Sequence, residues 1–524
     1  MTAVAPVVGL APERSNSKWL VAVAVALGAL LEIVDTSIVN VALTDMQATL
    51  GATLSQIGWV ITSYGIANVI ILPLSAWLGH RFGKKNYFLF SLVGFTLSSM
   101  LCGMSTSLIM LIVARILQGL TGGGLLAKAQ AILFETFPRE EQATAQGFFG
   151  AIVIAGPAIG PTLGGYIVTN FDWRWIFFIN LPLGILATFM VIAYLPKDQK
   201  NEQRSPVDWL AIALLAVGIG SFQTFLEEGQ SEDWFDSRFI TMLAVTAVLG
   251  LAAFVVRVLR SPHPVVDLRV LRYRSLWAGC ILSVVVGIAL YGALFSIPIF
   301  AQTILHYTAS ETGWLLAPGA LASAFMMPIA SKLVRSFDPR FILVLGALVL
   351  MLALRMLANL STQTSSADLF APLIVRAFGT VLMFLPLQLA SLGPVPKSDV
   401  AAATGLFNLT RQLGGSIGVA LLTVVLGRRE AFHSVVLSEK LVSTSPDVTQ
   451  RISMLTQGFM SKGASYDVAH SQALAIIKGT VAREAAVLSF DDTFWATIVL
   501  ILCSLPLVFL LGRPAQGQKV EMGH

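Results

Sequence analysis

The sequence contains little charge and little cysteine. Only 12% of its 524 residues are Asp, Glu, Lys or Arg, against about 25% in an average soluble domain. Its three cysteines, Cys102, Cys280 and Cys503, each lie in an apolar run, which argues against a disulfide framework or a cysteine metal site. What remains is 56% hydrophobic residues and 43 glycines, a composition typical of a helical protein that crosses a membrane several times.

Motifs for phosphate binding or catalysis are also absent from the sequence. No G-x-x-x-x-G-K-[ST] occurs, and the nearest glycine cluster, "GLTGGGLLAKAQ" at 119–130, indicates close helix packing instead. No Ser/His/Asp arrangement or metal-ligand cluster is found, so we expect no enzyme activity, no metal and no cofactor. The formal net charge is +5, but the positive residues lie in short loops between apolar runs, which does not indicate a nucleic-acid partner.

Fourteen apolar runs are long enough to cross a bilayer, because a hydrocarbon core of about 30 Å needs about 20 helical residues. They lie at about 19–43, 57–78, 87–106, 108–133, 144–169, 174–195, 207–227, 238–258, 275–302, 312–333, 341–359, 369–392, 402–427 and 490–512. The predicted fold class is therefore all-α, a polytopic membrane protein with fourteen transmembrane helices.

The positive residues between these runs predict the orientation of the chain. If the N-terminus is cytoplasmic, the inner segments carry twenty Lys or Arg residues and the short outer loops carry two, Arg174 and Arg238. Lys and Arg are retained on the cytoplasmic side of a membrane. We therefore expect both termini in the cytoplasm.

An internal repeat relates the two ends of the chain. Four positions recur at an offset of 258, with Gly147, Phe149, Gly156 and Gly160 matching Gly405, Phe407, Gly414 and Gly418. "LIVAR", ending at Arg115, likewise resembles "LIVR", ending at Arg376. Two repeated halves of the same orientation are typical of transporters that bind substrate near the bilayer midplane.

The repeat divides the chain into five predicted parts. They are the N-terminal six-helix half at 1–200, two inserted spans at 201–262, the first five spans of the C-terminal half at 263–427, an outer segment at 428–489, and the last span with a cytoplasmic tail at 490–524.

Seven ionisable residues lie well inside the predicted spans, where each costs about 2.5–3.5 kcal/mol on insertion scales. They are Glu32, Asp35, Arg115, Lys128, Arg355, Arg376 and Arg411. Such residues face the protein interior and either pair or act in function. Five cations against two acids would attract anionic or weakly acidic substrates; the alternative is that the cations snorkel or bond helix ends.

Glu32 and Asp35 lie in the stretch "LEIVDTSIVNVAL" and share one polar stripe of a helix. Asp35 is about 22 Å, and Arg115 about 27 Å, above the cytoplasmic ends of their spans, so the two side chains can meet. The pair is either a static link between the first and fourth spans or a proton site. Glu32 has no evident cation at its depth and is the stronger candidate for carrying the proton.

Several inward-facing polar or aromatic residues are candidates for lining a substrate cavity between the halves. They are Asn40, Gln130, Tyr291, Gln302, Arg376, Gln388, Asn408, Arg411 and Gln412.

Two further motifs have predicted roles. "AGPAIGPTLGG" at 155–165 provides a glycine ridge for close helix contact and two prolines that permit bending, through Gly156, Pro157, Gly160, Pro161, Gly164 and Gly165. "GHRFGKK" at 79–85 is expected to be an inner turn that clamps helix ends and anionic lipid as a gate, or else ordinary cytoplasmic positive charge, through His80, Arg81, Gly83, Lys84 and Lys85.

These motifs together resemble the major facilitator superfamily, in its fourteen-span drug:proton antiporter branch of EmrB/QacA-like permeases. "LEIVDTSIVNVAL" is similar to the first-span motif of the branch, "RILQG" to the fourth-span motif, and "GPAIGPTLGG" to the fifth-span antiporter motif. "WRWIFFINLPLG" at 173–184 and "NLTRQLGGSIGVAL" at 408–421 are the most specific matches. The resemblance implies a location in the bacterial inner membrane and a proton-coupling role for Asp35 and for Arg115.

The inner loop departs from the superfamily pattern, since Ala76 and His80 stand where a Gly and an Asp are usual. The charge relay assigned to that Asp is therefore not expected here. The resemblance also implies a periplasmic adaptor and an outer-membrane channel as partners. The outer segment 428–489 is a candidate contact surface for them, the alternative being an unstructured loop.

The predicted function is proton-driven export of hydrophobic drugs or toxic compounds, with lipophilic small molecules, protons and membrane lipids as the interacting species. One alternative is a dedicated exporter of an endogenous metabolite such as a fatty acid or siderophore. An alternative of another class is a membrane sensor or scaffold that does not transport, for which two buried acids would have no use beyond a static pair.

Overall fold

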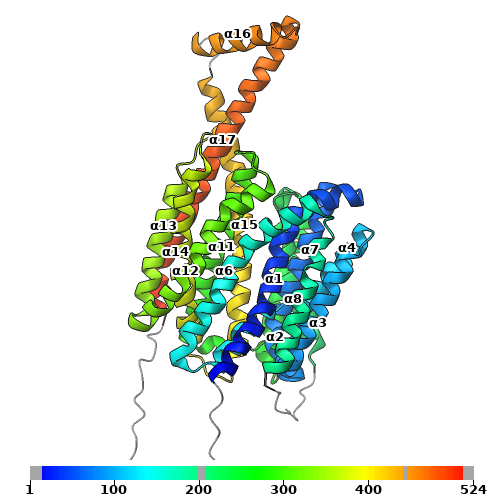
Figure 1. The fold of residues 1–524 in the computed structure, drawn as a ribbon, viewed down its shortest axis with the longest axis vertical. Coiled ribbons are helices and arrows are strands. Elements are labelled where there is room, and N and C mark those ends of the chain that lie inside the picture. The colour runs from blue at the N-terminus through cyan, green and yellow to red at the C-terminus, as the bar shows by residue number, and fades with distance from the viewer. Residues whose placement is uncertain (1–14, 197–206, 442–445, 512–524) are drawn as a thin grey trace, which may run out of the picture.

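The computed structural model describes residues 15–196, 207–441 and 446–511 and contains no strand within them. Fourteen helices are long and apolar enough to cross a membrane. The prediction of an all-α protein with fourteen spans is therefore confirmed. Figure 1 shows the helices standing side by side in a bundle, with the described chain beginning and ending at the end of the bundle opposite a projecting helical arm.

The N-terminal part of the bundle contains eight helices. They are α1 (Ser15–Leu50), α2 (Leu54–Phe82), α3 (Lys84–Gly103), α4 (Leu108–Gly122), α5 (Leu125–Thr136), α6 (Arg139–Asn170), α7 (Trp175–Phe178) and α8 (Asn180–Tyr194). The span expected at 108–133 is interrupted between α4 and α5, where Gly124 has a φ of +92°. A Cβ on Gly124 would lie 2.8 Å from the Cβ of Ser75, so both the backbone conformation and the close approach require glycine.

The next two long helices along the chain are α9 (Trp209–Glu228) and α10 (Arg238–Arg260), and the short helix η1 (Trp234–Asp236) lies between them in the sequence. They cross closely, because a Cβ on Gly250 would lie 2.9 Å from the Cα of Gly218. Asp208 caps α9 and accepts a hydrogen bond of 2.9 Å from Arg257 of α10. That bond to the guanidinium holds the pKa of Asp208 below its usual value.

The C-terminal part continues through seven helices and two short 3₁₀ segments. They are η2 (Leu268–Arg272), α11 (Arg274–Thr303), α12 (Ala309–Ser336), α13 (Pro339–Leu357), α14 (Ser366–Leu392), α15 (Val400–Lys440), α16 (Pro446–Met460), α17 (Tyr466–Ser504) and η3 (Leu505–Leu510).

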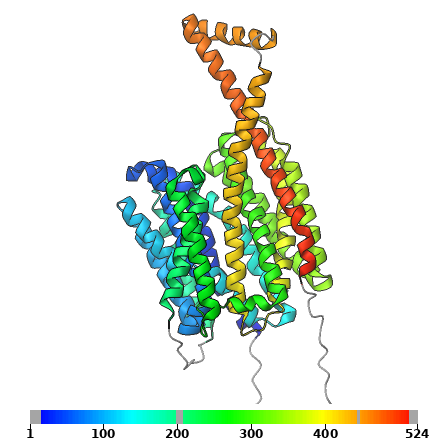
Figure 2. The same ribbon diagram turned by 180° about the vertical axis from the view of Figure 1, so that it is seen from behind.

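The described residues of the outer segment 428–489 form a helical arm. The arm consists of the last part of α15, the whole of α16 and the first part of α17. Figures 1 and 2 show α15 and α17 continuing out of the bundle and α16 lying across their far ends. At the base of the arm, Asp492 of α17 lies 2.6 Å from Arg429 and 2.7 Å from His433, both on α15. The alternative of an unstructured loop at 428–489 is therefore wrong for the described residues.

The two halves use the same glycine positions to pack their helices. A Cβ on Gly156 would lie 2.6 Å from Ile33 of α1, and a Cβ on Gly160 would overlap Ser37 and lie 2.9 Å from the backbone nitrogen of Ile38. In the repeat, Gly414 and Gly418 of α15 approach Val284 and Ile288 of α11 in the same way. The glycine ridge therefore holds α6 against α1, the helix that carries Glu32 and Asp35.

We predict that Gly160→Ala lowers the stability of the protein by about 1–3 kcal/mol, because overpacking forces the backbones of α1 and α6 apart. Gly58→Ala is the matched control, since a Cβ on Gly58 meets nothing within 4 Å. Thermal unfolding of the two purified variants measures the difference. Equal melting temperatures would show that α6 can shift away from α1 at no cost.

Candidate functional site

Asp35 is the centre of a fully buried polar cluster in the N-terminal half. Its exposed fraction is 0%, and its Oδ2 lies 2.6 Å from Nη1 of Arg115 on α4. Its Oδ1 accepts hydrogen bonds from Gln118 Nε2 at 2.8 Å and from Asn180 Nδ2 at 3.0 Å. The contact predicted between Asp35 and Arg115 is therefore present, and every donor in this cluster comes from the N-terminal half.

Arg115 has further partners besides Asp35. Its Nη1 also donates to Gln118 Oε1 at 2.8 Å, its Nε donates to the carbonyl of Val60 at 3.1 Å, and its guanidinium lies 4.0 Å from the ring centre of Tyr64. A buried ion pair with this many additional hydrogen bonds offsets the desolvation of its two charges. The cluster thus joins α1, α2, α4 and α8.

Glu32 is buried without an ion pair. Among the described residues no Lys, Arg or His nitrogen lies within 4 Å of its carboxylate. Its oxygens instead accept hydrogen bonds of 2.8 Å from Asn68 Nδ2 and 2.8 Å from the backbone nitrogen of Leu126. Neutral donors stabilise a buried carboxylate less than a cation does, so Glu32 differs in kind from Asp35.

The hydrogen bonds of Glu32 continue into the other half of the protein. Asn68, which donates to Glu32, accepts a hydrogen bond of 3.2 Å from Gln412 Nε2 of α15. Glu32, Asn68 and Gln412 therefore form a chain from α1 through α2 to the C-terminal half. Any movement of α15 relative to α2 changes the surroundings of the Glu32 carboxylate.

Three more of the predicted cavity residues join the halves directly. Asn408 of α15 donates to Gln130 of α5, and Gln388 of α14 donates to Gln146 of α6. Arg411, a fourth predicted residue, donates to Asn408 Oδ1 on the same helix at 2.9 Å. In this conformation these side chains close the seam between the halves, so they are not brought together around an open cavity.

The remaining predicted cavity residues lie apart from this group. Asn40 is exposed and donates only to the carbonyl of Thr36 on its own helix. Gln302 is exposed near the end of α11, and Tyr291 packs where a Cβ on Gly415 would stand. Arg376 lines a separate pocket between α6, α11, α12 and α14.

The inner-loop residues contact the ends of neighbouring helices. His80 and Arg81 belong to the last turn of α2, so the turn itself is formed by Gly83, whose φ is +90°. Lys84 pairs with Glu135 of α5 at 2.7 Å, and Lys85 donates to the carbonyls of Ile192 and Leu195 at the end of α8. The loop therefore ties the ends of α5 and α8 together.

Two further cations predicted inside the spans, Lys128 and Arg355, also have hydrogen-bond partners. Lys128 is buried and donates to the carbonyl of Ser75, and Arg355 donates to Asn359 near the end of α13.

Four buried amide residues of the site are not among the residues predicted from the sequence: Asn68, Gln118, Asn180 and Gln146. Each is an uncharged amide inside an apolar span, and each is buried against a predicted site residue. Their polarity within a membrane span is the signal that was available, because buried amides in such segments need partners.

Comparison with known proteins places the chain in a family. The model of the Major Facilitator Superfamily matches residues 25–419. The chain belongs to this superfamily.

Within the superfamily, the chain is similar to EmrB-like export proteins. The chain is 32% identical to the multidrug export protein EmrB of Escherichia coli (strain K12), over 94% of this chain and 95% of that protein. It is 31% identical to the fatty acid resistance protein FarB of Neisseria gonorrhoeae, over 96% and 98%. A structure of the superfamily member XylE has a TM-score of 0.60 at 13% identity, covering 95% of this chain and 97% of that one, and it supports the fold alone. The predicted resemblance to EmrB-like facilitators is confirmed, and the protein is a multi-pass transporter of the bacterial inner membrane.

We predict that Asp35→Asn destabilises this facilitator by about 3–5 kcal/mol, because it leaves the buried Arg115 guanidinium without its counterion. Adding Arg115→Gln removes the unpaired charge and should recover much of that loss. Thermal unfolding of both purified variants measures the effect. A double variant no more stable than the single one would contradict the account of the pair.

Proposed function

We propose that this protein exports hydrophobic drugs or toxic compounds from the cell in exchange for protons, by alternating access. The observation that carries the proposal is the hydrogen-bonded chain from the buried, unpaired Glu32 through Asn68 to Gln412, which links a proton-binding group to the seam between the halves. The similarity to EmrB of Escherichia coli, a multidrug export protein, supports the same function.

In this proposal the units that rock are the halves assigned from the sequence. Residues 1–200 form one unit, and residues 263–427 with the last span in 490–524 form the other, with the inserted spans 201–262 beside them. Both termini lie in the cytoplasm, as the distribution of Lys and Arg favours. The loop at 79–85 acts as an inner gate, and the ridge at 155–165 keeps α1 and α6 in register.

Glu32 is the proposed proton carrier, and Asp35 with Arg115 is the structural support beside it. Protonation of Glu32 removes the negative charge that Asn68 and the backbone of Leu126 stabilise. The chain to Gln412 is then weaker, so the halves separate more readily at this seam. Asp35 stays paired with Arg115 inside one half, where opening of the seam does not reach it.

We predict that Glu32→Gln abolishes proton-driven export while leaving passive exchange of substrate. In proteoliposomes with an imposed pH gradient, uphill transport of a fluorescent lipophilic substrate should fall at least about 100-fold, since the amide that replaces the proposed proton-binding carboxylate cannot take up and release a proton. Asp45→Asn is the matched control, because Asp45 is an exposed acid on the same helix.

Wild-type rates with unchanged pH dependence in Glu32→Gln would exclude Glu32 as the carrier. The double variant Asp35→Asn/Arg115→Gln separates the two readings of the ion pair: a static pair predicts retained pH-driven transport once stability is recovered. A protein that moves no substrate in either direction would favour the non-transporting sensor or scaffold.

A dedicated exporter of one endogenous metabolite, such as a fatty acid or a siderophore, is the second candidate function. The similarity to FarB of Neisseria gonorrhoeae, a fatty acid resistance protein, favours the fatty acid over the siderophore. Susceptibility of a deletion strain to lipophilic acids, neutral compounds and cations distinguishes the candidates, since a dedicated exporter protects against one chemical class only.

The helical arm is the proposed contact for a periplasmic adaptor that leads to an outer-membrane channel. The ends of α15 and α17 project beyond the bundle, and α16 lies across them (Figure 2). A rigid helical surface binds a partner at lower entropic cost than a loop that must first be ordered.

We predict that replacing residues 441–465 with a short Gly-Ser linker abolishes drug resistance in cells, because the adaptor is no longer engaged. Transport by the same variant in proteoliposomes should stay within about twofold of wild type, since the arm lies outside the bundle. Full resistance in cells would exclude the arm as the adaptor contact.

A further inference from the structure

Arg376 is a buried guanidinium without a partner. It lies on α14 with an exposed fraction of 9%, and its Nε makes no hydrogen bond. Among the described residues no carboxylate lies within 4 Å of its guanidinium. The charge has therefore lost its hydration without gaining a counterion. A buried charge without a counterion is strongly unfavourable, so its presence calls for a ligand.

The internal repeat shows why Arg376 is unpaired. Its equivalent in the N-terminal half is Arg115, which is neutralised by Asp35 on the first helix of that half and held by Gln118. The first helix of the C-terminal half, α11, contains no acidic residue, and the position equivalent to Gln118 is Gly379. The C-terminal half has kept the cation and lacks both of its polar partners.

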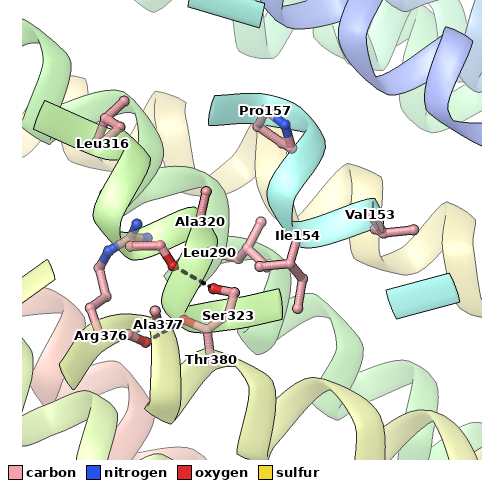
Figure 3. A pocket seen from close by; sticks show the side chains of 11 residues that line it. Val153, Ile154, Pro157, Leu290, Leu316, Ala320, Ser323, Arg376, Ala377 and Thr380 are labelled. Carbon is pink, nitrogen blue, oxygen red and sulfur yellow. Dashed lines mark hydrogen bonds between the residues drawn. The ribbon is translucent and has the colours of Figure 1, made fainter. Parts of the chain in front are cut away.

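Arg376 lines a pocket between the two halves. Figure 3 shows Val153, Ile154 and Pro157 of α6 on one side, with Leu316 and Ala320 of α12 and Arg376 and Thr380 of α14 on the other. The walls are apolar except for Ser323 and Thr380, whose hydroxyls donate to the carbonyls of Gly319 and Arg376. Arg376 is therefore the main donor available to a ligand.

The size of the pocket limits what part of a ligand it takes. Its volume is about 30 Å³, which is room for two water-sized atoms and far less than the roughly 300–1,000 Å³ of a drug-sized site. Two oxygens on one carbon fit both this volume and the planar fork of a guanidinium. One uncompensated positive charge matches one negative charge.

We propose that the Arg376 pocket is a subsite for the carboxylate head of lipophilic monocarboxylate substrates. The apolar body of the ligand lies along the α6 and α12 walls, where Ile154 and Leu316 flank the pocket. Because α6 and α12 belong to different halves, the subsite changes shape when the halves move. This assignment rests on the proposed export function and names one substrate class for it.

The test compares three ligands of one chain length, decanoate, decan-1-ol and decyltrimethylammonium, on the full-length protein in nanodiscs. Arg376→Gln should weaken decanoate binding at least about tenfold, as expected for losing a charge-assisted hydrogen bond, and leave the alcohol and the cation within about twofold. Arg355→Gln is the matched control, since Arg355 is an exposed arginine on α13 of the same half.

Thermal unfolding shows whether a loss of decanoate binding results from a misfolded variant. Arg376→Gln without ligand should melt no lower than wild type, because it removes an uncompensated charge, and its melting temperature should no longer rise with decanoate. Ala320→Leu, which fills the pocket and keeps the charge, should also lose decanoate binding. Decanoate affinity unchanged in Arg376→Gln would overturn the proposal.

Transport distinguishes this proposal from the proposed function. Proteoliposomes in which Arg376→Gln still exports the decyltrimethylammonium cation but not decanoate support both. Export of both ligands at wild-type rates overturns the subsite alone. Decanoate binding that depends on Arg376 in a wild-type protein that exports nothing supports the subsite and overturns the export function.

Discussion

The cost of placing charge away from water is the constraint that organises this structure. The desolvation cost of Asp35 and Arg115 is offset because the two charges pair with each other and because Gln118, Asn180 and the carbonyl of Val60 make further hydrogen bonds to them. Those partners come from α2, α4 and α8, so the requirement to neutralise one carboxylate fixes four helices around α1. The glycine ridge of α6 then closes on the opposite side of the same helix.

The two halves share this packing and differ in their charge. Gly156 and Gly160 meet α1 as Gly414 and Gly418 meet α11, which is why the repeat is visible in the sequence. Arg115 and Arg376 occupy equivalent positions, yet only Arg115 has an acid opposite it. Equivalent positions in the two halves therefore hold different charge arrangements: a neutralised ion pair at Arg115 and an arginine without a counterion at Arg376.

The features that depend on hydropathy and depth could be predicted from the sequence. The fourteen spans and the contact between Asp35 and Arg115 follow from apolar length and from counting residues along two helices. The partners of Glu32 could not, because Asn68 is uncharged and the Leu126 donor is a backbone nitrogen exposed by the break at Gly124. Exposed Asn40 and Gln302 show the limit of inferring a cavity from polarity alone, since polarity does not give the face of a helix that meets the partner half.

The seam between the halves indicates which end of the bundle is closed. The side-chain hydrogen bonds that join the two halves include five between described residues, and four of these five lie within about three helical turns of the end opposite the arm. They are Arg335 to Thr144, Gln388 to Gln146, Lys397 to Glu135, Asn408 to Gln130 and, further along the seam, Gln412 to Asn68. Substrate can enter the protein from that end only if these bonds break. Of the five, only the bond from Gln412 to Asn68 involves a side chain that also donates to a buried carboxylate, that of Glu32. Because Asn68 serves both Glu32 and Gln412, the charge on Glu32 and the closure of the seam depend on the same amide.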